Sequence, residues 1–386
     1  GLIEVVENDR PRIDYTDSAD GALLLEPQRM NSFLQSEDIS NSVWTALAGG
    51  ETIVSDSIIS PDGSQNADTL QGDGTSTNVY VRQNVTLSAS VNYTFSIFAK
   101  KGTNNFLAIS AEGFTGATNT LLIFDLNNNI VTNGTGNIKD YGNGWLRCSF
   151  TIAISTDGIG RFLIYPAYNG TTRGFPTSSD ANGQNIYLYG AQIEQGSYAT
   201  SYIPTQGSAV TRVAETASGS GNSEVFNDSE GVLFADIAAN ANDGIKRSIS
   251  INDGSSANRF ILRFGVNDNT IEFVSSSNNS AVLLSSVAVA GGLSSIKVAA
   301  KWDSNNYVFY VNGIIETTKN DLITPLVLNN LDFNDGNNNF NPFYGKTKEL
   351  GCYDTALTNA ELETLTSYRS WLSMVNELNL NVIYNG

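Results

Sequence analysis

Short apolar segments with a period of two recur along this chain and limit the folds open to it. In residues 79–87 (VYVRQNVTL) and 92–102 (NYTFSIFAKKG), apolar and polar side chains alternate, as in a β-strand with one buried face. Gly, Asn and Ser crowd the spaces between such segments, and these residues favour turns. Short strands with turns about every 8–12 residues are typical of a β-sandwich or jelly roll.

Two series of strands are expected. The first series continues through residues 105–113, 120–134 (a hairpin turning at Asn127 to Asn129), 144–155, 160–168 and 184–194. The second comprises residues 230–240, 247–253, 258–275, 293–318 and 341–354. Asn312-Gly313, between two apolar segments of the second series, is a strong signal for a tight hairpin.

The chain of 386 residues is long enough for two or three domains of roughly 100–200 residues each. We expect an N-terminal segment over 1–37, a jelly roll over 38–215, a linker over 216–224 and a second sandwich over 225–386. Within the first segment, the apolar Leu23 to Leu25 predicts a short strand or hairpin that docks on a neighbouring domain.

One helix is expected, near the C-terminus. Thr358 followed by Glu361 forms a capping box, which marks a helix start. Apolar residues then recur at helical spacing, at Leu362, Leu365, Tyr368, Leu372 and Val375. The sequence therefore predicts an all-β protein with two β-sandwich (jelly-roll) domains in tandem and a short C-terminal helix.

Charge and composition exclude several functions. The formal net charge of −18 disfavours binding to a nucleic-acid backbone. No window holds about 18 consecutive apolar residues, so no membrane-spanning helix is expected. The chain has no histidine and only two cysteines, Cys148 and Cys352, which we place in different domains and expect to be buried and unpaired. Nucleophilic sites that need histidine and zinc centres are therefore ruled out by count, and we expect no enzymatic activity.

Several motifs resemble a module common in the virion proteins of tailed bacteriophages. They are PRIDYTDSADGALLLEPQRMNSFLQSEDISNSVW (11–44), NGWLRCSFT (143–151) and IYLYGAQIEQGSYATSYIPTQGSAVTRVAE (186–215). The chain departs from the family at Met30, where the family usually has Thr. The resemblance implies a jelly roll similar to carbohydrate-binding modules, with the stretch after Glu194 returning along the domain as an exit strap.

The second series of strands resembles a concanavalin A-like (laminin-G-like) sandwich. The resemblance rests on VFYVNGIIE (308–316) and GKTKELGCYDTALTNAELETL (345–365), in which a last strand leads into a helix. Glycosidases of this fold carry a Glu-x-Asp-x-x-Glu strand, and this sequence has no such run.

Sugar binding needs an aromatic platform for the apolar face of a pyranose, and polar groups for its hydroxyls. The candidates in the first domain are Trp44, Tyr80, Tyr165, Tyr168, Arg173 and Phe175. Four of them lie in the polar, Gly-rich stretch LIYPAYNGTTRGFPTSSD (163–180), which has the composition of a binding loop. The alternative for each aromatic residue is packing in the core or at its rim.

The acidic stretch 329–341 (NNLDFNDGNNNFN) contains a candidate Ca²⁺ site at Asp332, Asn334 and Asp335. Carboxylate and amide oxygens are suitable calcium ligands. However, Gly336 falls one position early for a calcium loop and no Glu closes it. A solvated turn is the alternative, and no other cofactor is expected.

These observations predict a phage virion appendage, such as a tail fibre or spike, that presents lectin-like domains at the virion surface. Its expected partners are host-surface glycans and other virion proteins. A homo-oligomer, with a trimer favoured, would raise the avidity of weak individual sites. The alternatives are a secreted bacterial carbohydrate-binding protein and a purely structural module of the virion.

Overall fold

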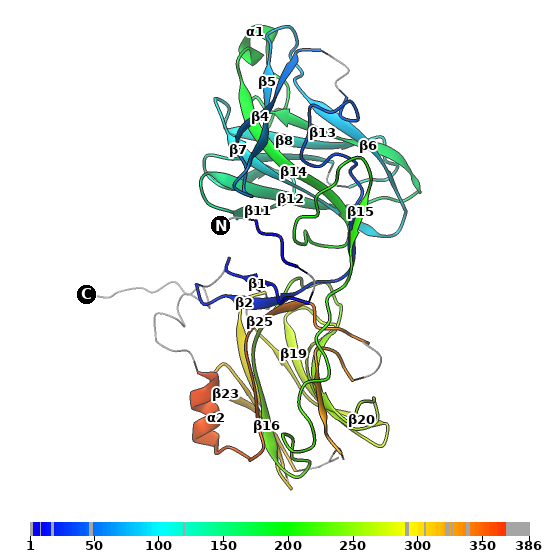
Figure 1. The fold of residues 1–386 in the computed structure, drawn as a ribbon, viewed down its shortest axis with the longest axis vertical. Coiled ribbons are helices and arrows are strands. Elements are labelled where there is room, and N and C mark those ends of the chain that lie inside the picture. Colours follow the sequence, from blue (N-terminus) through cyan, green and yellow to red (C-terminus); the bar gives the residue numbers. More distant parts are fainter. Residues whose placement is uncertain are drawn as a thin grey trace, which may run out of the picture. The chain divides into compact units, whose positions relative to one another are not determined.

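The computed structural model describes residues 3–7, 9–16, 19–45, 49–118, 120–289, 293–304, 306–320, 325, 327–336 and 340–367. The chain is almost entirely β-structure (Figure 1), which confirms the predicted fold class. Among the described residues, no helix has the length and apolar character that a bilayer crossing requires.

The chain divides into two compact units. The first unit contains residues 1–7 and 28–213, and the second contains residues 8–27 and 214–386. The N-terminal segment expected over 1–37 is therefore divided between the units, with residues 8–27 in the second and residues 28–37 in the first.

Two antiparallel sheets form the sandwich of the first unit. One sheet has the order β10 (Ile130–Asn133), β9 (Leu121–Asp125), β8 (Phe106–Glu112), β13 (Gly158–Pro166) and β6 (Val81–Leu87). The other has the order β11 (Asn137–Asp140), β12 (Trp145–Ala153), β7 (Asn92–Lys101), β14 (Asn185–Gln195), β5 (Gln65–Gly72) and β4 (Glu51–Ile59). Inward side chains of both sheets share one apolar core, which includes Phe95, Phe124 and Phe162.

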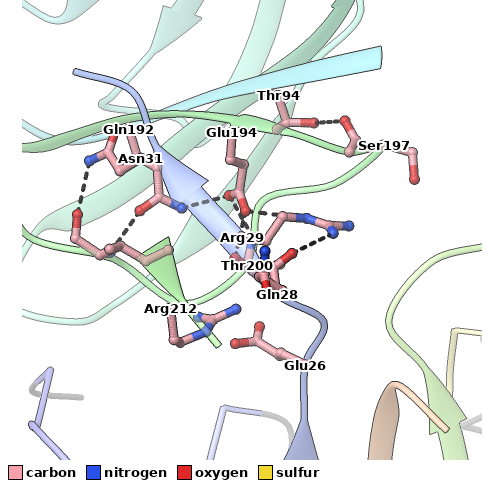
Figure 2. A network of polar contacts seen from close by, with 12 residues as sticks. Glu26, Gln28, Arg29, Asn31, Thr94, Gln192, Glu194, Ser197, Thr200 and Arg212 are labelled. Atoms are coloured by element: carbon pink, nitrogen blue, oxygen red, sulfur yellow. Dashed lines mark hydrogen bonds and ion pairs between the residues drawn. The ribbon is translucent and has the colours of Figure 1, made fainter. Parts of the chain in front are cut away.

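A buried polar network holds the strap that follows β14. Glu194 lies on β14 and accepts hydrogen bonds from the Thr200 amide (2.9 Å) and hydroxyl (2.6 Å) and from Gln192 Nε2 (2.6 Å). Figure 2 shows Arg29 beside the same carboxylate, at 3.6 Å between Arg29 Nε and Glu194 Oε2. A buried carboxylate is stable only when it is satisfied in this way.

The strap is also fixed through Asn31. Its Nδ2 donates to the carbonyls of Ala191 (3.1 Å) and Ile203 (2.9 Å), so one amide joins β14 to the strap. Farther along, β15 (Val210–Arg212) pairs with β3 (Arg29–Asn31) in a separate two-stranded sheet. The pairing of β15 with β3 thus attaches the later part of the motif of residues 186–215 to β3, the first strand of the same unit.

Two antiparallel sheets also form the second unit. One has the order β1 (Ile13–Asp14), β2 (Ala22–Leu25), β25 (Gly345–Tyr353), β16 (Gly231–Ala239), β21 (Ile296–Trp302), β22 (Tyr307–Val311) and β23 (Ile314–Lys319). The other has the order β20 (Ser280–Ala288), β19 (Thr270–Ser277), β18 (Arg259–Phe264), β17 (Arg247–Asn252) and β24 (Asn330–Asp332). Trp302, Phe260 and Phe273 lie in the core between them.

The N-terminal hairpin completes the larger sheet of the second unit. Leu23 pairs with Ile13 on one side and with Thr347 of β25 on the other. This confirms the strand predicted at Leu23 to Leu25. At the end of β2, Arg12 forms ion pairs with Glu26 (2.8 Å) and Glu215, and the Glu215 carboxylate also accepts the Glu26 amide (2.7 Å).

Local signals for turns and caps are confirmed. Asn312 and Gly313 have φ values of 48° and 82°, which fit the two-residue turn between β22 and β23. A short helix, α1 (Ser178–Ala181), lies in the first unit. The C-terminal helix α2 (Asn359–Thr366) begins at Thr358, whose hydroxyl and Glu361 form the expected capping box. The helical residues predicted at Tyr368, Leu372 and Val375 lie outside the described residues.

Candidate functional site on the first unit

Alternation along β6 and β13 directs a set of polar and aromatic side chains away from the core of the first unit. Val81 and Val85 of β6 belong to that core, so Arg82 and Asn84 point to the opposite face. On β13, Phe162 and Ile164 are core residues, so Arg161 and Tyr165 share the outer face with Arg82 and Asn84.

Strand register places these outward residues in rows across the sheet. Arg161 of β13 lies opposite Asn84 of β6 and Glu112 of β8. One row along, Leu163 lies between Arg82 and Ser110. Neighbouring strands are about 4.8 Å apart, so the side chains of one row are within reach of each other.

The loop after β13 adds a second guanidinium to this face. The Tyr168 amide donates to the Arg173 carbonyl (3.3 Å), which closes the loop on itself. Arg173 Nη1 then donates to Ser110 Oγ and to Glu112 Oε1, both at 2.7 Å. Its guanidinium carbon lies 5.1 Å from the ring centroid of Tyr165, a cation–π distance.

Glu112 is held between two arginines. Arg161 Nη2 lies 3.2 Å from Glu112 Oε2, while Arg173 binds the other carboxylate oxygen. Burial alone would raise the pKa of Glu112, but hydrogen bonds from Arg173 and Arg161 outweigh it and lower the pKa below its ordinary value. Glu112 therefore stays ionised and fixes both guanidinium groups.

Solvent reaches this outer face. The side chains of Arg161 and Arg173 are 40% and 36% exposed, and Tyr168 is exposed. Tyr80 is half-buried, with its ring centroid 5.2 Å from that of Tyr165. We call this surface the arginine–tyrosine face, formed by Tyr80, Arg82, Asn84, Ser110, Glu112, Arg161, Tyr165, Tyr168 and Arg173.

Four of the six predicted sugar-binding residues lie together on the arginine–tyrosine face. These are Tyr80, Tyr165, Tyr168 and Arg173. Tyr165 itself is buried, and burial raises the pKa of its hydroxyl above the ordinary value. It therefore acts as the floor under Arg173, while Tyr168 offers an exposed ring.

Trp44 and Phe175, the other two predicted sugar-binding residues, do not lie on this face. Both are buried in the core of the first unit. The Trp44 ring packs against Phe33 at 5.2 Å, and its Nε1 donates to the Gln35 carbonyl at 2.7 Å. Phe175 is only 6% exposed. Neither ring has a face open to a sugar, because their neighbours in the core already occupy it.

The calcium site stays a prediction, and the structure gives each candidate side chain a partner within the protein. Asp332 accepts from the Gly219 amide and from Asn252 Nδ2, Asn334 accepts from the Gly336 amide, and Asp335 pairs with Arg259 at 3.5 Å. Each of these three side chains therefore has a hydrogen-bond or ion-pair partner within the protein. In the part of the chain that is described, no group of three or more Asp, Glu, Cys or His side chains could hold a metal ion.

Three charged residues of the face, Arg82, Glu112 and Arg161, were missed from the sequence. The signal for two of them was present, because Arg82 follows Tyr80 by two residues and Arg161 precedes Tyr165 by four. Those spacings place each pair on one face of a strand. Glu112 could not be found in this way, since its position depends on the pairing of β8 with β13.

Comparison with known proteins found one matching family and several similar solved structures. No curated protein sequence matches the chain. Among solved structures, Ruminococcus gnavus IT-sialidase CBM40 is 18% identical, with 40% of this chain and 97% of that chain covered and a TM-score of 0.32. A SAP-like pentraxin from Limulus polyphemus is 15% identical (40% and 76% covered, TM-score 0.32). Sheep galectin-11 is 8% identical (36% and 99% covered, TM-score 0.27).

Similarity to these solved structures is too remote to carry an inference about binding. The family match is more specific, because it covers a continuous part of the second unit, from β16 into α2. Residues 237–363 match the family described as the Concanavalin A-like lectin/glucanases superfamily. Residues 237–363 of the second unit are therefore similar to a concanavalin A-like domain, in agreement with the resemblance of motifs 308–316 and 345–365.

Proposed function

We propose that the first unit binds a saccharide on the arginine–tyrosine face and that the chain is an adhesive, lectin-like protein. One observation carries this proposal: a single carboxylate fixes two partly exposed guanidinium groups on the outer sheet face, beside the loop that carries an exposed tyrosine. Tyr168 is exposed, and Arg161 and Arg173 are both held by Glu112.

The chemistry of the face suits a sugar. The ring of Tyr168 can pack against the apolar side of a pyranose, which aromatic side chains favour. Asn84 is exposed in the same row as Arg161, and the amide and guanidinium groups can donate to hydroxyls. Because Glu112 orients both arginines in advance, little side-chain entropy is lost on binding.

We propose binding without turnover at this face. Hydrolysis of a glycosidic bond requires two carboxyl groups in most glycosidases, one of them protonated. Within β6, β8 and β13, all of which are described, Glu112 is the only carboxylate. Its lowered pKa keeps it ionised, so it is suited to positioning arginines and unsuited to donating a proton.

The finer proposal is that the chain belongs to a phage virion appendage, such as a tail fibre or spike, at the virion surface. Its support is the similarity of residues 11–44, 143–151 and 186–215 to phage virion proteins. In that setting the partners are host-surface glycans and other virion proteins. Several copies, with a trimer favoured, would raise avidity without new contacts.

A secreted bacterial carbohydrate-binding protein is the second candidate. It is favoured by the concanavalin A-like match at residues 237–363, since such domains are common in secreted proteins. Mass in solution separates the two candidates, because a compact trimer supports the appendage and a monomer supports the secreted protein.

A glycan array probed with the full chain tests the saccharide proposal. Tyr168→Ala should lower retention on the array about tenfold, because the exposed ring face is lost. The matched control is Phe340→Ala, which removes an exposed aromatic ring from the second unit and should leave retention unchanged. Absence of retention of the wild type on any glycan, or equal retention of wild type and Tyr168→Ala, would contradict the proposal.

A further inference from the structure

The charge of the arginine–tyrosine face is opposite to that of the chain. The whole chain contains 21 basic and 39 acidic residues, a net charge of −18. Strands β6, β8 and β13 contain Arg82, Arg161 and Glu112 as their only charged residues, and the loop after β13 adds Arg173. Three positive groups and one negative group leave a local charge of +2.

Glu112 does not neutralise all three arginines. It forms ion pairs with Arg161 and Arg173. Arg82 makes only a long hydrogen bond to Thr45 Oγ1 (3.4 Å) and pairs with no described carboxylate. The face therefore retains donors and positive charge that its own residues do not use.

These donors match a carboxylate. A guanidinium group presents N–H donors in a planar fork that fits two carboxylate oxygens, and charge-assisted hydrogen bonds are stronger than neutral ones. Exposed charges more than about 8 Å from a bound anion are largely screened at physiological salt, so arginines in contact with the anion outweigh the net negative charge of the whole chain.

We propose that the saccharide bound by the arginine–tyrosine face is acidic and carries a carboxylate, as a uronic acid does. This inference rests on the proposed saccharide-binding function. In the complex, the carboxylate lies against the guanidinium groups of Arg82 and Arg161, and the sugar ring lies toward Tyr168.

Matched glycan pairs test the inference with the full chain. Oligogalacturonates and oligoglucuronates are immobilised beside their methyl esters, which keep the sugar and remove the charge, and beside neutral glycans and sulfated glycans of similar length. The free acids should be retained at least tenfold better than their esters. Arg82→Gln should lower retention of the free acids about tenfold and retention of the esters much less, because the esters lack the charge that Arg82 contacts. Lys319→Gln, which removes an exposed charge of the second unit, should change neither.

The outcomes separate this inference from the function on which it rests. Retention of esters or neutral glycans as strong as that of the acids overturns the acidic class and leaves saccharide binding intact. Stronger retention of sulfated glycans than of carboxylated ones overturns the carboxylate assignment. Loss of retention in Lys319→Gln equal to that in Arg82→Gln also overturns it, because the effect then follows net charge. No retention of any glycan overturns both proposals.

Discussion

The outer faces of two sheets in this protein have opposite characters. In the first unit, the outer face of β8 and β13 carries a small buried cluster that includes Leu163 and Tyr165, and beside it Arg161 and Arg173 remain open to solvent. In the second unit, the outer face of β16, β21 and β22 carries Val232, Phe234 and Val308, and α2 covers it with Leu362. Outward residues therefore indicate whether a sheet face is covered by the protein or open to a ligand.

The largest loss of stability is expected when a buried aromatic ring that neighbours an exposed one is removed. Tyr168 and Phe175 are neighbours, with ring centroids 6.0 Å apart. Phe175→Ala should lower the free energy of unfolding by about 4 kcal/mol because it leaves a cavity in the core. Tyr168→Ala should change it by less than about 0.5 kcal/mol. Chemical denaturation of both variants measures the two changes. Similar losses of unfolding free energy would contradict the distinction between a buried ring and an exposed one.

The covered face of the second unit should be nearly as sensitive. Leu362→Ala removes the fully buried side chain by which α2 packs on the sheet, and should cost about 3 kcal/mol. Ile314→Ala on β23, where the side chain is exposed, is the control and should cost far less. Thermal or denaturant unfolding of the two variants gives the comparison, which fails if the exposed site is the more sensitive one.

The contributions of a buried and a partly exposed carboxylate to the stability of the fold should change with pH in opposite directions. Burial, with the nearby charges of Asp38 and Asp56, raises the pKa of Asp68 to about 6, although its oxygens accept the Ile39 and Asp56 amides. A pKa that is raised on folding adds stability at low pH, and this is lost as pH rises through about 6. Glu112, with its lowered pKa, adds stability above its ordinary pKa and loses it on acidification.

Unfolding measured between pH 4 and pH 7 tests the Asp68 effect. The wild type should lose stability relative to Asp68→Asn as the pH rises, since the variant cannot titrate at this position. Parallel pH profiles would show that the pKa of Asp68 is not raised by folding.

The smallest effect is expected at the start of α2. Thr358→Ala removes the hydroxyl that accepts the Glu361 amide and should cost about 1 kcal/mol. Thr358→Ser keeps the hydroxyl and should cost less. Unfolding of the two variants measures the difference, and a Ser variant as unstable as the Ala variant would speak against capping as the cause.

Local features of the fold were predictable from sequence, whereas residues brought together by distant pairings were not. Asn312-Gly313 and the Thr358–Glu361 capping box are short-range signals, and both formed as expected. Trp44 and Phe175 were predicted as site residues but are buried, because spacing alone does not show whether an aromatic ring in a connecting segment turns inward. Arg161 was accessible to sequence reasoning through its spacing from Tyr165, but its partner Glu112 was not.

The pairing of β2 with β25 has a consequence for how the chain is made. A ribosome synthesises β2 (Ala22–Leu25) long before β25 (Gly345–Tyr353). The hairpin that contains β2 therefore waits for its partner until the residues between the two strands have been synthesised, and such distant pairings form late. A fragment starting at residue 214 would lack β2, so β25 would become an unpaired edge strand. Exposed edge strands promote aggregation.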